Sequence, residues 1–391
     1  MLRVAQVITR FIAGAGGVAL RGALALDPDL YSVAIVSAPG GPLLAEAERA
    51  GLEVVLLEHM HPEINPAEDY RCLHELEEKL ADGHFDLVHT HSAKAGALGR
   101  IAARRAHVPG VVHTFHGFPF HNFQSWPLRM TYVEIEKRLG GITDQFLAVG
   151  GAVAAQAISL KIASPERIRT IASAIDINVA PVSQAGRMEA RRLMGLPMDA
   201  PVVGTVGRLA PQKAPQDMVA AMEAIGRAGV YCVWIGSGPL LRDTADLIQR
   251  KGLAGRFLLL GERNDVAALL PGFDVFALAS RYEGIPCSLV EAITCGIPVV
   301  ATAVNAVPEV VVPGRTGMLV PPSEPKLLAR AIAFLLDHPE QGERMADAAR
   351  VLIGDRFHPA ILGQDLALTY ELALRGRSSS FRRPLGLVAN A

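Results

Sequence analysis

Two glutamates, Glu283 and Glu291, are the side chains whose types and spacing most clearly suggest chemistry. Glu283 lies in a turn rich in glycine and proline, and Glu291 lies eight positions on, in a helix-patterned stretch that ends at Gly296. The apolar run Val275 to Ala279 just before them is typical of a short strand, and Pro286 suits the first position of a helix. The predicted order is therefore strand, turn, short helix and strand.

A helix N-terminus that opens at the end of a buried strand can bind a phosphate, because its backbone N–H groups are unpaired and its dipole end is positive. Carboxylates beside it would accept hydrogen bonds from sugar hydroxyls, Glu283 from a hexose and Glu291 from a ribose. Gly284, Ile285 and Leu289 are expected to line the same site. For two isolated glutamates, ordinary surface positions would be the simpler interpretation, since most glutamates are exposed.

The segment as a whole resembles the Glu-x7-Glu signature of the retaining family 4 glycosyltransferases. It has the Glu-Gly-x-Pro start at residues 283–286 and the Glu-Ala-x-x-x-Gly-x-Pro-Val-Val continuation at residues 291–300. The resemblance implies the GT-B architecture and transfer of a hexose or an N-acetylhexosamine from a nucleotide-diphosphate sugar, with a UDP-sugar as the expected donor. It also implies retention by front-face attack, in which the departing phosphate accepts the proton of the acceptor, without a cofactor or a metal ion.

A loop with one arginine and one lysine, Arg208 and Lys213, follows the strand-like run Val202 to Val206. A guanidinium can bind two phosphate oxygens and an ammonium adds a compact charge, so together they would offset the charge of a leaving diphosphate. Two solvated side chains would be the alternative in an arbitrary loop. Here Gly-Arg-Leu-x-x-x-Lys is similar to the diphosphate-binding segment of the same family, with Ala214 where a glycine is usual.

Small residues follow the next strand of this half, in the loop Gly236-Ser237-Gly238-Pro239, and they suit a ligand edge. Relatives in the family meet the nucleotide base in the loop after the following strand, which here holds Arg263 and Asn264. These four positions, Gly236, Gly238, Arg263 and Asn264, are expected to bind substrate. Asn305-Ala306 replaces a Gly-Gly pair of the family near the donor, which leaves donor preference open.

The N-terminal half carries a competing signal, the pattern G-x-G-x-x-A at residues 14–19. In a nicotinamide-dependent dehydrogenase this loop would hold a pyrophosphate, and an acidic residue about twenty positions on would hold the ribose. The second strand instead ends in Ile35-Val36-Ser37-Ala38-Pro39, without a carboxylate, which disfavours a dehydrogenase. The glycosyltransferase resemblance places Gly16 and Gly17 at a cleft, where missing side chains let donor phosphates and acceptor approach closely.

His116 is the candidate catalytic residue of the N-terminal half, because it follows the strand-like run Val111 to Phe115 and precedes Gly117. A buried core histidine is the alternative interpretation. In relatives a histidine at the matching place contacts the donor sugar, and this role is carried over to His116 as one of positioning and electrostatics rather than as a clear general base.

A metal site has to be weighed as well, because His89 and His91 share one face of a predicted strand. No third ligand has a suitable spacing. The GT-A glycosyltransferases would need an Asp-x-Asp motif at a strand end, whereas Asp27-Pro28-Asp29 has its proline in a turn after a helix. We therefore expect no metal site.

Residues 87–133 contain five lysines or arginines and no aspartate or glutamate. Arg100 and Arg104 lie one helical turn apart, and the aromatic loop that follows would suit a lipid headgroup boundary. Nucleic acid would fit the composition too, but a helix and a loop beside a cleft suit a lipid diphosphate better; a solvated helix face over a domain core is the third interpretation. Residues 86–176 also resemble transferases of bacterial surface-polysaccharide assembly, which glycosylate polyprenyl-diphosphate-linked saccharides.

Short β-rich runs alternate with helical patterns along the chain, which predicts an α/β fold with parallel sheets covered by helices on both faces. The alternation restarts at Pro201, so two Rossmann-like doubly wound domains facing an interdomain cleft, the GT-B architecture, are expected. The predicted parts are an acceptor-side domain at residues 1–180, a linker at 181–200, a nucleotide-sugar domain at 201–360, a C-terminal helix at 361–376 that packs back toward the first domain, and a flexible tail at 377–391.

Composition agrees with two globular domains, since half of the 391 residues are hydrophobic and a fifth are charged. The formal net charge of −1 gives no overall attraction to nucleic acid or anionic lipid. The four cysteines are scattered, and the N-terminus runs straight into a strand with no signal peptide, which favours a reducing cytoplasm. We expect a cytoplasmic protein with peripheral contact at the inner face of the cell membrane.

Two other functions fit the same architecture. A sugar-nucleotide epimerase would isomerise the donor without an acceptor, and a catalytically weak scaffold subunit of a polysaccharide complex would turn nothing over.

Overall fold

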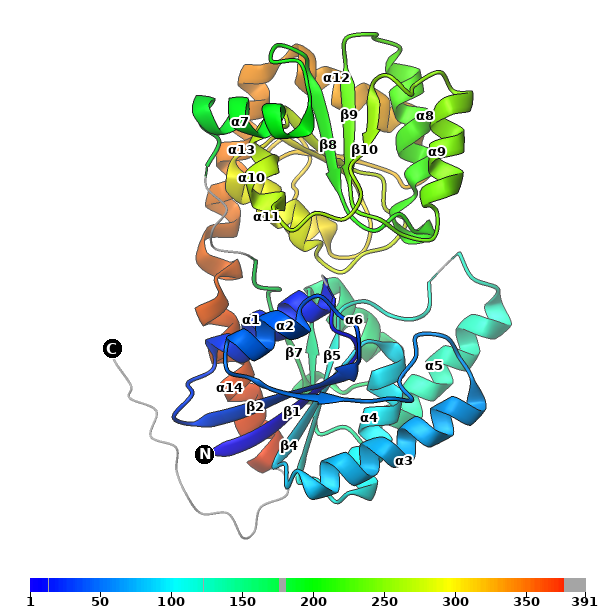
Figure 1. Ribbon diagram of the computed structural model, residues 1–391, viewed down its shortest axis with the longest axis vertical. Coiled ribbons are helices and arrows are strands. Elements are labelled where there is room, and N and C mark those ends of the chain that lie inside the picture. The colour runs from blue at the N-terminus through cyan, green and yellow to red at the C-terminus, as the bar shows by residue number, and fades with distance from the viewer. Residues whose placement is uncertain (13, 122, 176–180, 376–391) are drawn as a thin grey trace. The chain divides into compact units, whose positions relative to one another are not determined.

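The computed structural model describes residues 1–12, 14–121, 123–175 and 181–375, and the predicted tail at 377–391 lies outside them. The chain divides into two compact units. Among the described residues, the first unit contains Met1–Ala148, Gln156–Arg169 and Gly363–Arg375, and the second contains Val149–Ala155 and Thr170–Leu362. Each unit is an α/β structure built on one sheet (Figure 1).

The first unit has a seven-stranded sheet in the order β3-β2-β1-β4-β5-β6-β7. Its strands are β1 Leu2–Arg10, β2 Tyr31–Ala38, β3 Glu53–Leu56, β4 Leu87–His91, β5 Gly110–Phe115, β6 Gln145–Ala148 and β7 Ile168–Thr170. The pairings from β3 through β6 are all parallel. Its helices, with one 3-10 turn at Pro165–Arg167, are α1 Ala15–Ala25, α2 Leu44–Arg49, α3 Pro66–Asp82, α4 Ala93–Arg105 and α5 Trp126–Gly140. Helices α6 Gly151–Ser159 and α14 Pro359–Arg375 begin in residues of the second unit and continue into the first.

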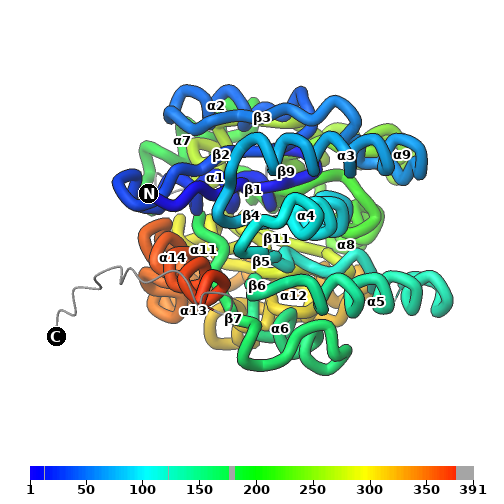
Figure 2. The backbone as a smooth tube through the Cα atoms, turned by 90° about the horizontal axis from the view of Figure 1, so that it is seen from below, coloured from blue at the N-terminus to red at the C-terminus, as the bar shows by residue number. Residues whose placement is uncertain are grey.

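Helices cover both faces of this sheet. On one face α3 and α4 run side by side (Figures 1 and 2), and their apolar stripes pack on alternate strand residues such as Val7 and Val88. On the other face α14 brings Tyr370 against Tyr31, with ring centroids 6.1 Å apart, and the Tyr370 hydroxyl lies 2.8 Å from Nδ1 of His89. The helix predicted near residues 361–376 is thus part of the first unit.

The second unit has a six-stranded sheet, parallel throughout, in the order β10-β9-β8-β11-β12-β13. Its strands are β8 Val202–Val206, β9 Tyr231–Ile235, β10 Phe257–Leu259, β11 Val275–Leu278, β12 Val299–Thr302 and β13 Met318–Val320. Its helices are α7 Gln184–Met194, α8 Pro215–Ile225, α9 Leu241–Arg250, α10 Val266–Leu269, α11 Cys287–Cys295, α12 Pro325–Asp337 and α13 Pro339–Ile353. Its 3-10 turns are Pro211–Lys213, Leu270–Gly272, Val307–Glu309 and Gly354–Phe357.

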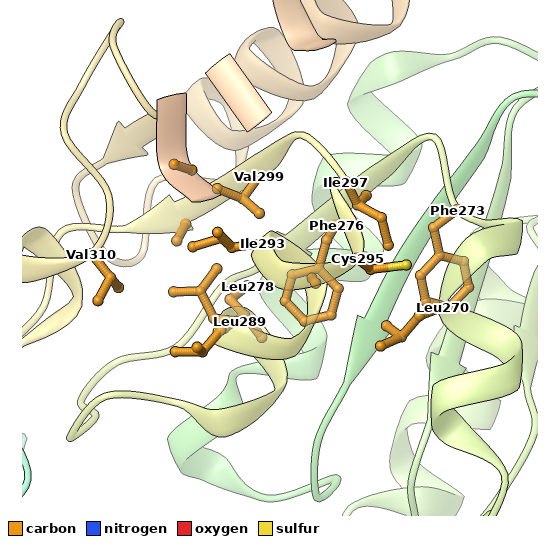
Figure 3. Packing of buried hydrophobic residues seen from close by; sticks show 14 of the residues in the cluster. Leu270, Phe273, Phe276, Leu278, Leu289, Ile293, Cys295, Ile297, Val299 and Val310 are labelled. Carbon is orange, nitrogen blue, oxygen red and sulfur yellow. The ribbon is translucent and has the colours of Figure 1, made fainter. Parts of the chain in front are cut away.

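Two apolar clusters lie on opposite faces of this second sheet, because successive strand residues point to opposite sides. Val275 and Ala277 pack with α8 and α12, whereas Phe276 and Leu278 pack with α7, α11 and α13. Figure 3 shows the second cluster, in which Leu289 lies beside Leu278. The predicted doubly wound architecture is confirmed for both units.

The residues predicted as a linker, 181–200, contain α7, which packs into the second unit. Ala190 and Met194 are buried there, and the guanidinium of Arg191 lies 2.7 Å from a carboxylate oxygen of Asp274. Ser183 caps the helix by accepting a hydrogen bond from the amide of Gly186.

In each sheet the strand order reverses next to the first strand of the unit, between β1 and β4 and between β8 and β11. Ligands of doubly wound sheets bind at this switch point, beyond the carboxyl ends of the strands. Within the described residues, no helix is long and apolar enough to cross a membrane. Among those described residues, no three or more His, Cys, Asp or Glu side chains are grouped so that they could hold a metal ion.

Candidate functional site

The switch point of the second unit brings the two sequence motifs together. Lys213 ends the loop after β8, and Glu283 lies in the loop after β11, the neighbouring strand. The ammonium of Lys213 lies 2.5 Å from Oε1 of Glu283, in a pair whose side chains are only 15% and 6% exposed. Burial of a carboxylate is unfavourable unless the group has a partner, so Lys213 compensates the burial of Glu283 and holds its side chain in place.

Two further residues fix Glu283. The side-chain amide of Gln212 donates to Oε2 of Glu283 at 3.2 Å and to the carbonyl of Tyr282 at 3.0 Å. Oδ1 of Asn305, in the loop after β12, accepts from the backbone amide of Glu283 at 3.1 Å. Sequence reasoning missed Gln212, because it stands at a variable position of the motif. Asn305 was singled out only as a departure from the family pattern.

Helix α11 begins at Cys287 with Pro286 as its N-cap, one position later than predicted. The hydroxyl of Ser288 donates to the carbonyl of Val206 at the end of β8, which holds the first turn of the helix at the switch point. Glu291 is half-buried in the same helix. The helix N-terminus and both glutamates therefore belong to one side of the second unit.

Three predicted binding residues around the first glutamate are themselves buried. Gly284 follows Glu283 directly, and Ile285 and Leu289 lie in the apolar cluster of Figure 3. The amide of Leu289 donates to the carbonyl of Pro286 at 3.1 Å. The side chain of Leu289 thus anchors α11 in the core.

Arg208 is exposed in the loop after β8, and the glycines of the loop after β9 let that loop lie directly against it. A Cβ on Gly236 would fall 2.3 Å from the carbonyl oxygen of Gly207, and one on Gly238 would fall 2.4 Å from that of Leu209 and 2.9 Å from Cγ of Arg208. Gly236 also has a φ of +133°, which side chains rarely adopt. These glycines are needed for the close approach of two backbones.

The loop after β10 is tied to the loop after β9, because the amide of Gly236 donates to the carbonyl of Gly261 at 2.7 Å. In this loop Arg263 is paired with Asp265, its Nε lying 2.8 Å from Oδ1. Asn264 is exposed. Ala214 has a φ of +46°, a strained value for alanine that the usual glycine of the family would tolerate.

In the first unit His116 follows β5 and is half-buried. Its Nε2 lies 2.9 Å from Nδ1 of His91, the last residue of β4. Burial lowers the pKa of His116 to about 4, so its imidazole is neutral near pH 7. Both ring nitrogens of His89 are hydrogen-bonded, Nδ1 to the hydroxyl of Tyr370 and Nε2 to the hydroxyl of Thr114 at 2.7 Å. These bonds hold His89 inside the first unit.

Gly16 and Gly17 are buried in the first turn of α1, directly after β1. A Cβ on Gly16 would meet the backbone of Phe11 at 3.3 Å, and one on Gly17 would meet the guanidinium of Arg21 at 3.2 Å. Gly16 therefore lets the start of α1 pack closely on the backbone after β1, whereas at Gly17 only the flexible end of Arg21, on the same helix, would have to move.

The basic helix face expected for lipid contact does not exist at Arg100 and Arg104. Arg100 is fully buried and lies 2.9 Å from a carboxylate oxygen of Glu136, and Arg104 pairs with Asp144 at 2.7 Å. Both partners stand just beyond the acid-free stretch. The local sequence bias therefore reflected internal pairing, as a buried charge requires a partner.

These two sheets, with a cation pair of loops and a carboxylate at a switch point, define a nucleotide-binding α/β enzyme. Residues 187–352 match the family model described as Glycosyl transferases group 1, and residues 12–179 match Glycosyltransferase Family 4. The chain belongs to glycosyltransferase family 4.

Two curated relatives are similar to the chain. The UDP-Gal:alpha-D-GlcNAc-diphosphoundecaprenol alpha-1,3-galactosyltransferase of Escherichia coli is 31% identical over 314 residues, which are 78% of this chain and 80% of that protein. The D-inositol 3-phosphate glycosyltransferase of Mycobacterium tuberculosis is 33% identical over 267 residues, which are 65% of this chain and 54% of that protein.

Solved structures show the same fold at low sequence identity. Anabaena HepE in complex with UDP-glucose has a TM-score of 0.81 at 22% identity, covering 95% of this chain and 100% of that one. WaaG, a glycosyltransferase involved in lipopolysaccharide biosynthesis, has a TM-score of 0.77 at 16% identity, covering 94% and 99%. The predicted GT-B fold and glycosyltransferase class are confirmed.

Proposed function

We propose that this glycosyltransferase moves a hexose or an N-acetylhexosamine from a UDP-sugar to a polyprenyl-diphosphate-linked saccharide, with retention of anomeric configuration and without a metal ion. The donor class is supported by HepE, a fold neighbour solved with UDP-glucose, and the acceptor class by the name of the Escherichia coli relative. The observation that carries the proposal is the buried pair of Lys213 and Glu283 at the switch point of the family domain.

The proposed chemistry is front-face displacement at the anomeric carbon of the donor. The bond from that carbon to the phosphate oxygen breaks, the acceptor oxygen bonds to the same face, and the acceptor proton passes to the departing phosphate. Arg208 and Lys213 offset the charge that develops on the diphosphate, as preorganised cations do. Glu283 accepts hydrogen bonds from the sugar hydroxyls and orients the ring.

The remaining predicted residues are proposed to bind rather than to react. Glu291 holds the ribose, and Arg263 and Asn264 lie at the base. Gly236 and Gly238, together with Gly284 and Ile285, shape the donor site, while Leu289 fixes the helix behind it. In the first unit His116 is proposed to contact the donor sugar, and Gly16 and Gly17 to leave space for phosphates and acceptor.

Glu283 is not proposed as a nucleophile. One of its oxygens already accepts from Lys213 and the other from Gln212. Hydrogen bonds to an ionised carboxylate stabilise the charged form and reduce its reactivity. The remaining lone pairs can still accept hydroxyl protons from a sugar, which suits an orienting role.

We also propose peripheral contact with the inner face of a membrane, at the start of α5 in place of the paired arginines. Phe123, just before α5, and Trp126 and Leu128, in its first turn, are 52%, 70% and 46% exposed, and Arg129 follows on the helix. Aromatic and aliphatic side chains beside a cation suit the boundary between headgroups and acyl chains.

The transfer is tested with a panel of UDP-sugars, each incubated with and without a polyprenyl-diphosphate-linked saccharide. Acceptor-dependent UDP release, an α-configured product from an α-linked donor, and full activity in a chelator are the expected results. A new sugar isomer formed without acceptor would instead support the epimerase, and no turnover with any donor would support the scaffold.

The membrane contact is tested by sedimentation with vesicles of phosphatidylcholine and phosphatidylglycerol. Phe123→Ala combined with Trp126→Ala should release the protein, whereas Leu352→Ala, an exposed leucine on α13, should not. Equal binding of all three proteins would contradict contact at the start of α5.

A further inference from the structure

His91 and His116 end two neighbouring strands of the first sheet, and they form a direct pair. In the ladder between β4 and β5, His91 stands opposite Thr114, so His116 lies just past it at the carboxyl edge. Nδ1 of His91 lies 2.9 Å from Nε2 of His116, and the ring centroids are 5.2 Å apart. His91 is 2% exposed, whereas His116 reaches the surface of the edge.

Both rings of this pair are neutral. Desolvation holds the pKa of His91 well below its ordinary value, and the nearby rings of His89, His116 and His113 lower it further. A neutral imidazole carries one hydrogen, on one of its two nitrogens. In this pair one ring must therefore donate and the other must accept.

The surroundings of His91 decide which ring donates. Nε2 of His91 is buried and has no hydrogen-bond partner among the described residues. If Nδ1 of His91 accepted, the hydrogen of His91 would stand on Nε2 as a buried N–H without an acceptor, which native proteins rarely contain. If Nδ1 donates, Nε2 carries only a lone pair, and an unsatisfied acceptor is less costly.

We infer that His91 is a positioning residue that donates its Nδ1–H to Nε2 of His116 and so fixes the tautomer of His116. The hydrogen of His116 then stands on Nδ1, the nitrogen that makes no hydrogen bond within the described residues. His116 thus offers a donor, not a base, to an oxygen of its ligand. Under the proposed function, on which this second step rests, that oxygen belongs to the donor sugar.

Two variants separate the donor function of His91 from its bulk. His91→Asn keeps an N–H near the position of Nδ1, because the asparagine amide nitrogen is equally far along the side chain. His91→Leu fills similar space but cannot donate. Neither variant introduces a buried charge. A third variant, His116→Gln, lacks the ring of His116 and so identifies the signals of that ring in the spectra.

The direct test is the tautomer of His116, read from long-range nitrogen-proton correlations of the uniformly labelled full chain. We expect the Nδ1–H form in the wild type and in His91→Asn, and loss of that form in His91→Leu. The Nε2–H form in the wild type would overturn the inference, and so would an unchanged tautomer in folded His91→Leu. The wild-type spectrum decides the direction even if His91→Leu does not fold.

The kinetic test compares KM for the UDP-sugar with the affinity for UDP, because only the UDP-sugar carries the sugar that His116 is proposed to contact. KM for the UDP-sugar should rise about tenfold in His91→Leu and return toward the wild-type value in His91→Asn, as for one hydrogen bond. Affinity for UDP alone, measured by calorimetry, should stay constant. A wild-type protein that turns over no UDP-sugar would contradict the proposed function, while the tautomer measurement would still decide the role of His91.

Discussion

The ammonium of Lys213 lies 2.5 Å from Oε1 of Glu283, although 70 positions separate the two residues in the chain. They meet because the strands that precede their loops, β8 and β11, are neighbours at the switch point. The carboxylate that would orient the sugar and the cation that would stabilise the diphosphate thus form one unit. Each side chain is expected to depend on the other for its position.

Removing the cation of this pair should destabilise the second unit. Lys213→Ala leaves the carboxylate of Glu283 buried without its partner, and we expect a loss of about 3 kcal/mol in the free energy of unfolding. Glu283→Gln should restore part of this loss in the Lys213→Ala protein, because a neutral amide needs no cation. Urea unfolding of the four proteins measures the coupling, and additive losses would contradict it.

The carboxylate itself should matter for turnover more than for the fold. Glu283→Gln keeps the size of the side chain but loses its charge, and we expect kcat/KM for the UDP-sugar to fall at least about 100-fold. Affinity for UDP, which lacks the sugar, should change little. Kinetics like the wild type in a folded Glu283→Gln protein would remove Glu283 from the site.

Arg208 should contribute to nucleotide affinity. The aliphatic part of its exposed side chain lies beside Gly238. Loss of hydrogen bonds from its guanidinium to phosphate oxygens should weaken UDP binding about 10- to 100-fold in Arg208→Ala. Arg242→Ala removes an exposed arginine of α9 and serves as the matched control. Isothermal calorimetry gives both affinities, and equal values for the two variants would exclude phosphate binding by Arg208.

Asn305 should contribute both to stability, through its left-handed backbone conformation, and to the position of Glu283, through its side-chain oxygen. Its φ of +43° is tolerated by asparagine and glycine but strained for alanine, and its Oδ1 accepts from the amide of Glu283. Asn305→Ala should therefore lower the free energy of unfolding by about 1 kcal/mol more than Asn305→Gly. Both should raise KM for the UDP-sugar, since both lose the hydrogen bond. Equal stabilities in urea would show that the strain is absent.

The first unit should lose stability in mild acid. Burial lowers the pKa of His89 to about 3 and holds those of His91 and His113 well below their ordinary value of 6.5. Below pH 6.5 the unfolded chain binds protons that the folded unit does not, so the free energy of unfolding falls as pH falls. The expected slope is about 1.4 kcal/mol per pH unit for each of these three histidines, down to the folded pKa.

Calorimetric unfolding of the full chain between pH 5 and pH 8 measures this effect. His89→Gln should reduce the slope, whereas His74→Gln, on the exposed face of α3, should leave it unchanged. A transition of the first unit that does not move with pH would mean that these histidines gain protons without unfolding.

The sequence predicted several strands well because their apolar runs are bounded by turns. Strand β8 has the predicted limits, and β5 and β11 each differ from them by one residue. It did not predict β7 Ile168–Thr170 or β13 Met318–Val320, since three residues are too few to show a period. The motif residues Lys213 and Glu283 could be predicted to meet, because the carboxyl ends of parallel strands share one edge.

Partners far apart in the chain could not be predicted in the same way. The local bias around Arg100 suggested an exposed basic face, but its charge is matched by Glu136 on the next helix. His91 drew notice only as a strand neighbour of His89, and its bond to His116 depends on how β4 and β5 are aligned. Register and long-range pairing leave no signal in a single sequence.

Tyr370 of α14, which bonds to His89 in the middle of the first sheet, has a consequence for the order of synthesis. The first unit draws on both ends of the chain, and the whole second unit is translated between its parts. On the ribosome, the contacts of Tyr370 with His89 and Tyr31 therefore cannot form until the second unit has been translated and α14 has emerged. The first unit is therefore completed only after the second unit, which is inserted in its sequence, has been synthesised.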